Sequence, residues 1–78
     1  MTVYEVWDLP SRNLVGTYAT KKKALAALRA SLDSFGADYV ADFMLGQEDA
    51  NGRSKMVAAG SDLVALALAF EPEGTPTI

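Results

Sequence analysis

A run of three lysines beginning at Lys21 is the most unusual chemical feature of this chain. It follows Thr20, a residue type that often caps the first turn of a helix. The helix dipole favours anions over cations in that turn, by about 0.3–1 kcal/mol for each charge. A helix start with several ammonium groups could hold a phosphate or a carboxylate instead. The candidate contacts for such an anion, or for a nucleic acid, are Arg12, Lys21, Lys22, Lys23 and Arg29.

The alternative interpretation of the lysine run is a solvated helix face that keeps the protein soluble. Exposed charges of this kind cost little free energy, so this is the interpretation that we favour. The chain has seven basic and ten acidic residues and a net charge of −3, which opposes binding to a polyanion. That average conceals an asymmetry, because no acidic residue lies between Leu9 and Leu32, where five of the seven basic residues occur.

Paired carboxylates are the other groups that could do chemistry. Asp38 and Asp42 are four residues apart and Glu48 is next to Asp49, and such pairs can transfer protons or hold a divalent cation. No catalytic base or glycine-rich phosphate loop accompanies them. The chain also lacks His and Cys, which removes imidazole bases, thiolate nucleophiles and the usual zinc ligands. We therefore expect no enzyme activity, no catalytic residue, no bound metal and no cofactor.

The first half of the chain predicts a hairpin followed by a helix. Residues 3–7 and 14–18 are rich in β-branched and aromatic side chains, and the segment between them has turn chemistry. From Lys21 to Phe35 the apolar residues recur with helical spacing, and Gly36 is placed to end the helix. The residues of this apolar face are Leu25, Leu28, Leu32 and Phe35.

Three aromatic residues of the first hairpin, Tyr4, Trp7 and Tyr18, lie close in sequence to basic residues. Aromatic side chains in such a setting can stack on nucleic-acid bases. In so small a core, we expect instead that Trp7 packs over the leucine face of the helix.

The second half repeats this order. Residues 43–48 and 53–59 predict two strands joined by a turn at Asn51-Gly52, with Met56 and Ala58 on one face of the second strand. Ser61 is placed to cap a second helix, which ends near Phe70. We expect a single α+β domain over residues 1–70, built from two antiparallel hairpins that are each followed by a helix (ββαββα). Its four-stranded sheet carries the helices on one face, and residues 71–78 form a flexible tail.

Residues 63–70 leave no polar side on the second helix. Such a helix is either covered on both sides or lacks a partner, and Phe43, Met44 and Met56 add further apolar area. We therefore expect a homodimer in which a second copy covers this helix or a sheet edge. The candidate dimer contacts are Leu63, Leu66 and Phe70. The alternative is that the helix simply forms a second cover for the sheet.

The longest apolar stretch, residues 63–70, has eight residues, whereas a membrane span needs about 20. We therefore expect no membrane contact. The first nine residues have neither the basic region nor the long apolar run of a signal peptide. A chain without cysteine is most simply cytoplasmic.

Several motifs resemble those of short uncharacterised bacterial proteins of ββαββα order. They include Asn13-Leu14-Val15-Gly16 in the first hairpin and Thr20 followed by Ala24-Leu25 at the helix start, and the resemblance continues through the second hairpin. This resemblance covers most of the chain and implies no activity.

The helix start Thr20-Lys21-Lys22-Lys23-Ala24 is also similar to that of the arm-type DNA-binding domain of tyrosine integrases and to that of HicB-type antitoxins. Lysines replace the acidic residues of both patterns, and the third strand of the integrase domain is missing ahead of the helix. We therefore expect a non-catalytic interaction module that is homodimeric and that has a protein partner. The alternative is a nucleic-acid-binding or antitoxin-like regulator that uses the basic region 12–29.

Overall fold

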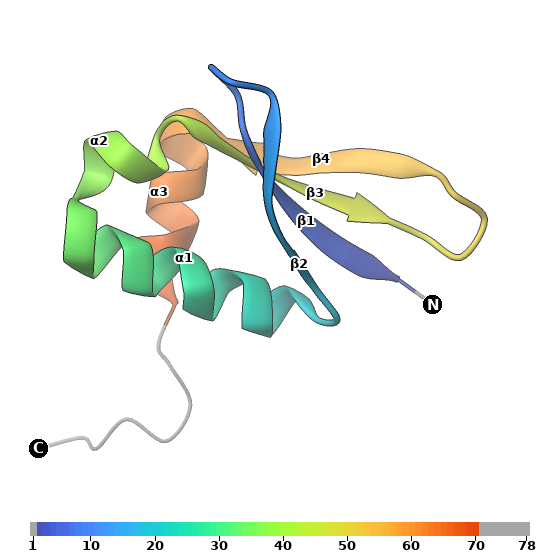
Figure 1. The fold of residues 1–78 in the computed structure, drawn as a ribbon. Coiled ribbons are helices and arrows are strands. Elements are labelled where there is room, and N and C mark those ends of the chain that lie inside the picture. Colours follow the sequence, from blue (N-terminus) through green and yellow to red (C-terminus); the bar gives the residue numbers. More distant parts are fainter. Residues whose placement is uncertain (1, 71–78) are drawn as a thin grey trace, which may run out of the picture.

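Four strands form one antiparallel sheet in the order β2-β1-β3-β4, and three helices lie along one side of it (Figure 1). The computed structural model describes residues 2–70, so Met1 and the predicted tail, 71–78, lie outside the described residues. The elements are β1 (Val3–Asp8), β2 (Asn13–Tyr18), α1 (Lys21–Phe35), α2 (Ala37–Val40), β3 (Phe43–Glu48), β4 (Ser54–Ala59) and α3 (Gly60–Ala69). The predicted α+β fold class is confirmed, with the single turn α2 added in the segment that follows Gly36.

The core lies between the sheet and the helices. Val6 of β1 is paired with Leu45 of β3, which is paired with Ala58 of β4, and all three are buried. They meet α1, whose buried side includes Leu25, Leu28 and Leu32 as the sequence predicts. Because neighbouring residues of a strand point to opposite faces, Trp7 is turned away from the helices. The expectation that Trp7 covers the leucine face is therefore wrong, and Val6 has that role.

A bulge in each edge strand changes which side chains share a face. In β4, Ala58 is opposite Leu45 but Met56 is opposite Gly46, so Val57 is an extra residue. The bulge places Met56 on the helix-free face and Ala58 in the core, which corrects the prediction that both lie on one face. In β2, the residue skipped in the pairing is Val15.

Both predicted ends of α1 are confirmed. The Thr20 side chain accepts a hydrogen bond from the Lys23 N–H at 3.1 Å, and Gly36 follows the helix with a φ of 91°. Its ψ of 174° is outside the left-handed helical well, in a region that is essentially restricted to glycine. Phe35, the last residue of the predicted apolar face, is 66% exposed. Its ring stacks on Tyr39 of α2, with 4.7 Å between the ring centroids.

Helix α3 begins two residues earlier than the predicted cap implies. Its N-cap is Ala59, which makes no side-chain cap hydrogen bond, so the prediction of Ser61 as the cap is wrong. Gly60 has a φ of 60°, which lets β4 run directly into the helix without a connecting loop.

The Gly16 position in β2 is covered by an aromatic ring. A Cβ atom added at Gly16 would lie 2.7 Å from the Tyr18 hydroxyl oxygen and 3.1 Å from its Cζ atom. The Tyr18 ring packs against the core, so it cannot move aside without loss of contacts. A side chain at this position would therefore force the Tyr18 ring to shift.

We expect Gly16→Ala to lower the free energy of unfolding by about 1–2 kcal/mol, because the added methyl group overpacks the site. Urea unfolding followed by Trp7 fluorescence measures this change. In a Tyr18→Ala background the same substitution should cost much less, since the clashing ring is gone. An equal cost in both backgrounds would assign the effect to the backbone of β2.

Candidate functional site

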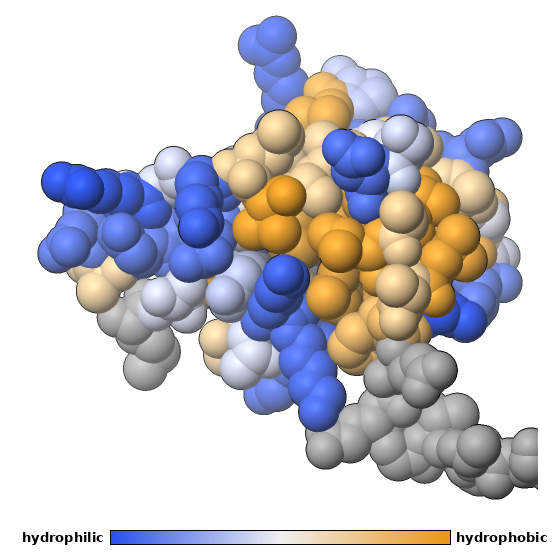
Figure 2. All heavy atoms as spheres, turned by 180° about the vertical axis from the view of Figure 1, so that it is seen from behind, coloured by the Kyte–Doolittle hydropathy of each residue, from blue (hydrophilic) through white to orange (hydrophobic). Residues whose placement is uncertain are grey.

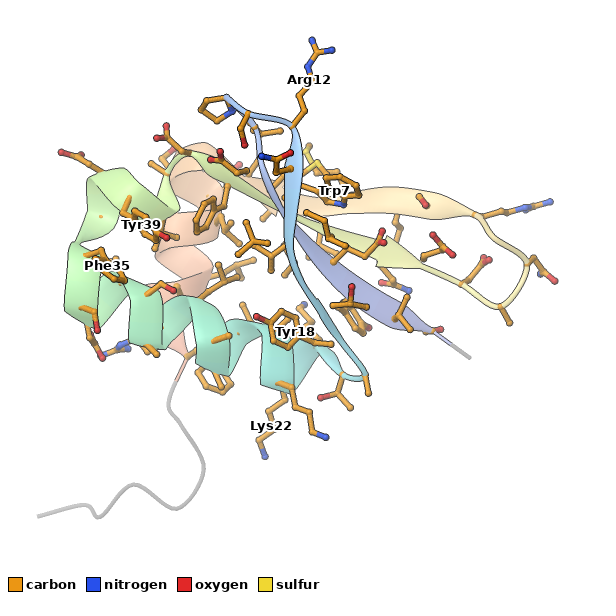
Figure 3. The ribbon with its side chains drawn as sticks, in the orientation of Figure 1. Trp7, Arg12, Tyr18, Lys22, Phe35 and Tyr39 are labelled. Carbon is orange, nitrogen blue, oxygen red and sulfur yellow. The ribbon has the colours of Figure 1, made fainter. Side chains whose placement is uncertain are left out.

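The predicted anion-binding residues do not form one site. Arg12 is at the tip of the β1–β2 loop, where its φ of 61° and the hydrogen bond from its N–H to the Asp8 carbonyl oxygen (2.7 Å) shape the turn. Its side chain points away from the rest of the molecule, whereas Lys22 lies near the start of α1 at the other end (Figure 3). The fold therefore separates Arg12 from the lysine run.

The three lysines themselves are exposed on the first turn of α1. The Thr20 hydroxyl accepts the hydrogen bond of the Lys23 N–H, so one of the N–H groups that an anion would use is already bonded. The interpretation as a solvated helix face fits this geometry.

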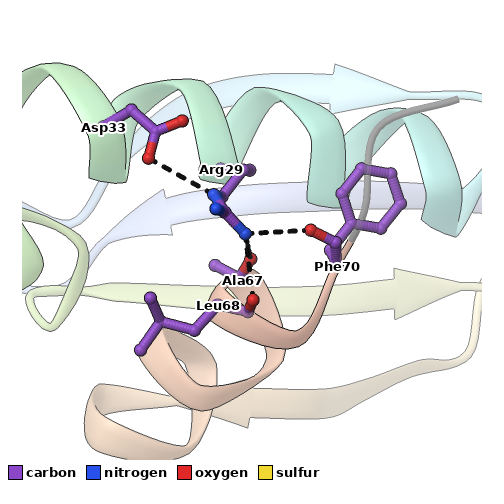
Figure 4. Close-up of polar contacts among 5 residues, drawn as sticks. All are labelled: Arg29, Asp33, Ala67, Leu68 and Phe70. Carbon is purple, nitrogen blue, oxygen red and sulfur yellow. Dashed lines mark hydrogen bonds and ion pairs between the residues drawn. The ribbon is translucent and has the colours of Figure 1, made fainter. Parts of the chain in front are cut away.

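Arg29 has a structural role instead (Figure 4). Its Nη1 atom donates to the carbonyl oxygens of Leu68 at 2.9 Å, Phe70 at 3.0 Å and Ala67 at 3.4 Å. These are carbonyl groups at the C-terminal end of α3, which carries partial negative charge. The Arg29 Nε atom also donates to Asp33 at 3.3 Å. The guanidinium group thus ties α1 to the end of α3.

The carboxylates of the described residues are not grouped as metal ligands. Within residues 2–70 no group of three or more acidic side chains could hold an ion together. Asp49 shapes the β3–β4 turn, because its Oδ1 atom accepts hydrogen bonds from the N–H groups of Asn51 (2.9 Å) and Arg53 (3.0 Å). Gly52 has the positive φ predicted for this turn, 79°.

The predicted dimer contacts lie mostly inside the protomer. Leu63 has no exposed surface, so a partner cannot reach it while the chain is folded. Leu66 and Phe70 are half-buried and pack against the core. The reason is geometric: α3 packs against α1, β3 and β4, and these contacts cover the side of the helix that carries Leu63 and Ala67.

The outward side of α3 is apolar and exposed. Leu68 is 59% exposed, Ala65 and Ala69 are exposed and Val64 is half-buried. We call these four residues the α3 face. They form one stripe because Leu68 is four residues after Val64 and Ala69 is four residues after Ala65. Figure 2 shows a continuous hydrophobic area over the part of the molecule that contains α3, whereas the tip of the β3–β4 hairpin is hydrophilic. The α3 face is therefore one candidate interaction surface.

The helix-free side of the sheet is a second candidate. The register places Trp7 beside Met44 and places Gly46 between Glu5 and Met56. These residues line a shallow depression of about 340 Å³, together with Glu48, Ser54 and Lys55. We call this surface the open face. Tyr4 and Tyr18, paired with one another, pack against the core on the opposite side. The three aromatic residues of the first hairpin therefore do not form a common stacking surface.

The sequence pattern could not identify either surface uniquely. Residues 63–70 are apolar on all sides, so nothing in that run distinguishes the buried Leu63 from the exposed Leu68. In β1, Tyr4 and Val6 alternate with Val3, Glu5 and Trp7. The charge of Glu5 favours the second set as the outward one, but the large apolar Trp7 in the same set favours the opposite orientation.

Searches of protein-family models, curated proteins and solved structures found no match to this chain. In the part of the chain that the structure describes, no helix has the length and apolar character needed to cross a membrane.

Proposed function

We propose that this protein is a non-catalytic interaction module that forms a homodimer through the α3 face. The observation that carries the proposal is the exposed apolar stripe of Ala65, Leu68 and Ala69, with the half-buried Val64 at its edge. A 78-residue chain has a small core, and extra buried apolar area contributes about 25 cal/mol per Å². A second copy that covers this stripe would therefore stabilise both protomers.

The composition of the α3 face suits a pair of helices. Ala65 and Ala69 are small, so two copies of α3 can approach closely, and Leu68 can then fill the space beside them. The stripe itself carries no charged residue, and Asp62, which is three residues before Ala65 on the same side of α3, lies at its end.

Charges at the two ends favour an antiparallel pair. Asp62 lies in the first turn of α3, and the guanidinium group of Arg29 lies at its last turn. In an antiparallel arrangement, Asp62 of each copy approaches the end of the other helix, where Arg29 is bound. The two helix dipoles are then also opposed, which is favourable.

We expect Leu68→Glu to convert the dimer to a monomer at tens of micromolar protein, because each copy would place a carboxylate in an apolar contact. Sedimentation velocity or light scattering after size exclusion measures the mass. Phe35→Glu is the matched control, since Phe35 is similarly exposed but lies at the end of α1. A wild-type chain that is already monomeric, or dissociation by Phe35→Glu alone, would refute this interface.

The nucleic-acid-binding alternative has less support. It depends on five basic residues acting together, but Arg12 points away from the lysine run and Arg29 is bonded to the carbonyl groups of α3. No observation in the described residues favours it as a second function.

A further inference from the structure

We infer that the open face binds a segment of another protein that presents an arginine or lysine side chain beside apolar residues. This surface lies on the other side of the sheet from α1 and α3, so it is separate from the α3 face. The inference does not depend on the proposed dimer.

The shape of the open face provides room for one extended side chain. Gly46 lies in the middle of β3 and has no side chain, so it forms the floor of the depression. A Cβ atom added there would be 3.7 Å from the Met44 Cε atom and 3.7 Å from the Lys55 carbonyl oxygen, which are ordinary contacts. A methyl group would therefore fit at Gly46 without strain, in van der Waals contact with the Met44 side chain.

The walls of the depression suit the aliphatic stem of a long cationic side chain. Trp7 is half-buried on β1, Met44 lies beside it on β3 and Met56 is 62% exposed on β4. Thioethers adapt to a flexible stem, and the indole ring attracts a guanidinium or ammonium group through its negative π face.

Two carboxylates are placed to pair with the charged end. Glu5 is directly opposite Gly46, and Glu48 is two residues from Gly46 on the same face of β3. Among residues 2–70 neither carboxylate makes a hydrogen bond or an ion pair, so both are available to a ligand. Lys55 also lines the depression, but in register it lies opposite Gln47, on the other face of β4.

The negative charges of the open face distinguish among the partners that could bind to an apolar sheet face. A second copy placed face to face would bring two pairs of glutamates together, and like charges across an interface are costly. Nucleic acid and anionic lipid head groups are opposed by the same two carboxylates. A segment that carries arginine or lysine among apolar residues satisfies both the apolar walls and the carboxylates.

The test is a titration of the full-length, ¹⁵N-labelled protein with a short peptide of alternating leucine and arginine. We expect amide shifts at Met44, Gly46 and Met56 and a shift of the Trp7 indole N–H. A peptide with glutamate in place of arginine, and one with serine in place of leucine, should bind at least tenfold more weakly. Equal binding of the glutamate peptide, or shifts located on α3 or on the lysine run, would overturn the inference.

Variants that keep the fold complete the test. Glu5→Gln with Glu48→Gln retains the shape and should weaken binding by about tenfold or more, with a smaller dependence on salt. Gly46→Val fills the floor and should also abolish the Met44 and Met56 shifts. Asp38→Asn with Asp42→Asn, two exposed acids away from the open face, is the charge-matched control and should bind as the wild type does. Unchanged affinity in the glutamine double variant contradicts the inference.

These experiments test the homodimer through the α3 face and peptide binding at the open face independently. The Leu68→Glu protein should bind the leucine–arginine peptide with the affinity of the wild type, because Leu68 and Trp7 are on different layers of the fold. If the loss of self-association accompanied Gly46→Val rather than Leu68→Glu, a second copy would be the occupant of the open face, and this inference would be wrong.

Discussion

Replacing Leu63 with alanine is expected to unfold much of this protein rather than to dissociate it. Leu63 is on the buried side of α3 and is fully buried in a core that also includes Leu28 and Leu45. Removing a buried leucine side chain costs about 2–5 kcal/mol, from lost transfer energy and from the cavity left behind. A domain of this length has a total stability on the order of 4–12 kcal/mol, so the loss is a large part of it.

The matched comparison is Leu68→Ala, five residues further along the same helix. Leu68 is 59% exposed, so its truncation should change protomer stability by less than about 0.5 kcal/mol. Urea unfolding followed by Trp7 fluorescence measures both changes, with every protein diluted until it is monomeric, because a dimer contact through Leu68 would otherwise add to the apparent stability. Equal costs at the two positions would mean that α3 packs in a different rotation from the one described.

The difference between these two leucines explains how far sequence reasoning could go for the candidate sites. The apolar composition of residues 63–70 correctly indicates a helix with more apolar surface than one side can bury. Residues 63–70 contain no polar residue that would mark the outward side of the helix. Only the packing of α3 against α1 and the sheet shows that Leu63 is buried and Leu68 is exposed.

Local signals predicted the fold well where backbone chemistry is strong. The Thr20 cap, the positive φ of Gly36 and the Asn51-Gly52 turn are all determined by the residues themselves, and α1 has the predicted bounds. The antiparallel sheet follows from two short hairpins joined by a helical connection.

The pairing register of the strands could not be predicted from local sequence signals. Strict alternation in β4 places Met56 with Ala58, but the extra residue Val57 moves them to opposite faces. A bulge is specified by the neighbouring strand and the core that it fits, not by a signature in its own residues. The open face became visible only once this register was known, because it brings Met56 beside Gly46.

The five basic residues between Leu9 and Leu32 are grouped in the sequence, but the fold does not bring them into one site. Arg29 belongs to this group by sequence, but its partners are the carbonyl groups of residues nearly 40 positions later, at the end of α3. Such a contact has a sequence separation that no local pattern can reveal. Because Arg29 joins two helices, its effect should appear in stability rather than in ligand binding.

Arg29→Ala is accordingly expected to lower the free energy of unfolding by about 2 kcal/mol, since hydrogen bonds that involve a charged group contribute roughly 1.5–3 kcal/mol. The side chain is 29% exposed, so water replaces part of what is lost and keeps the cost within this range. Urea unfolding gives the global change. Hydrogen exchange at Ala67, Leu68 and Phe70 gives the local one, and protection should fall there first, because the end of α3 loses its positively charged partner.

Three substitutions separate this role from a general charge effect. Arg29→Lys keeps the charge but not the planar group of donors, so it should recover only part of the stability. Asp33→Asn removes the carboxylate partner of an exposed pair and should cost less than about 1 kcal/mol. Arg53→Ala changes the net charge by the same amount as Arg29→Ala but lies in the β3–β4 turn, and should be nearly neutral. If Arg53→Ala were as destabilising as Arg29→Ala, net charge rather than the contact with α3 would explain the loss.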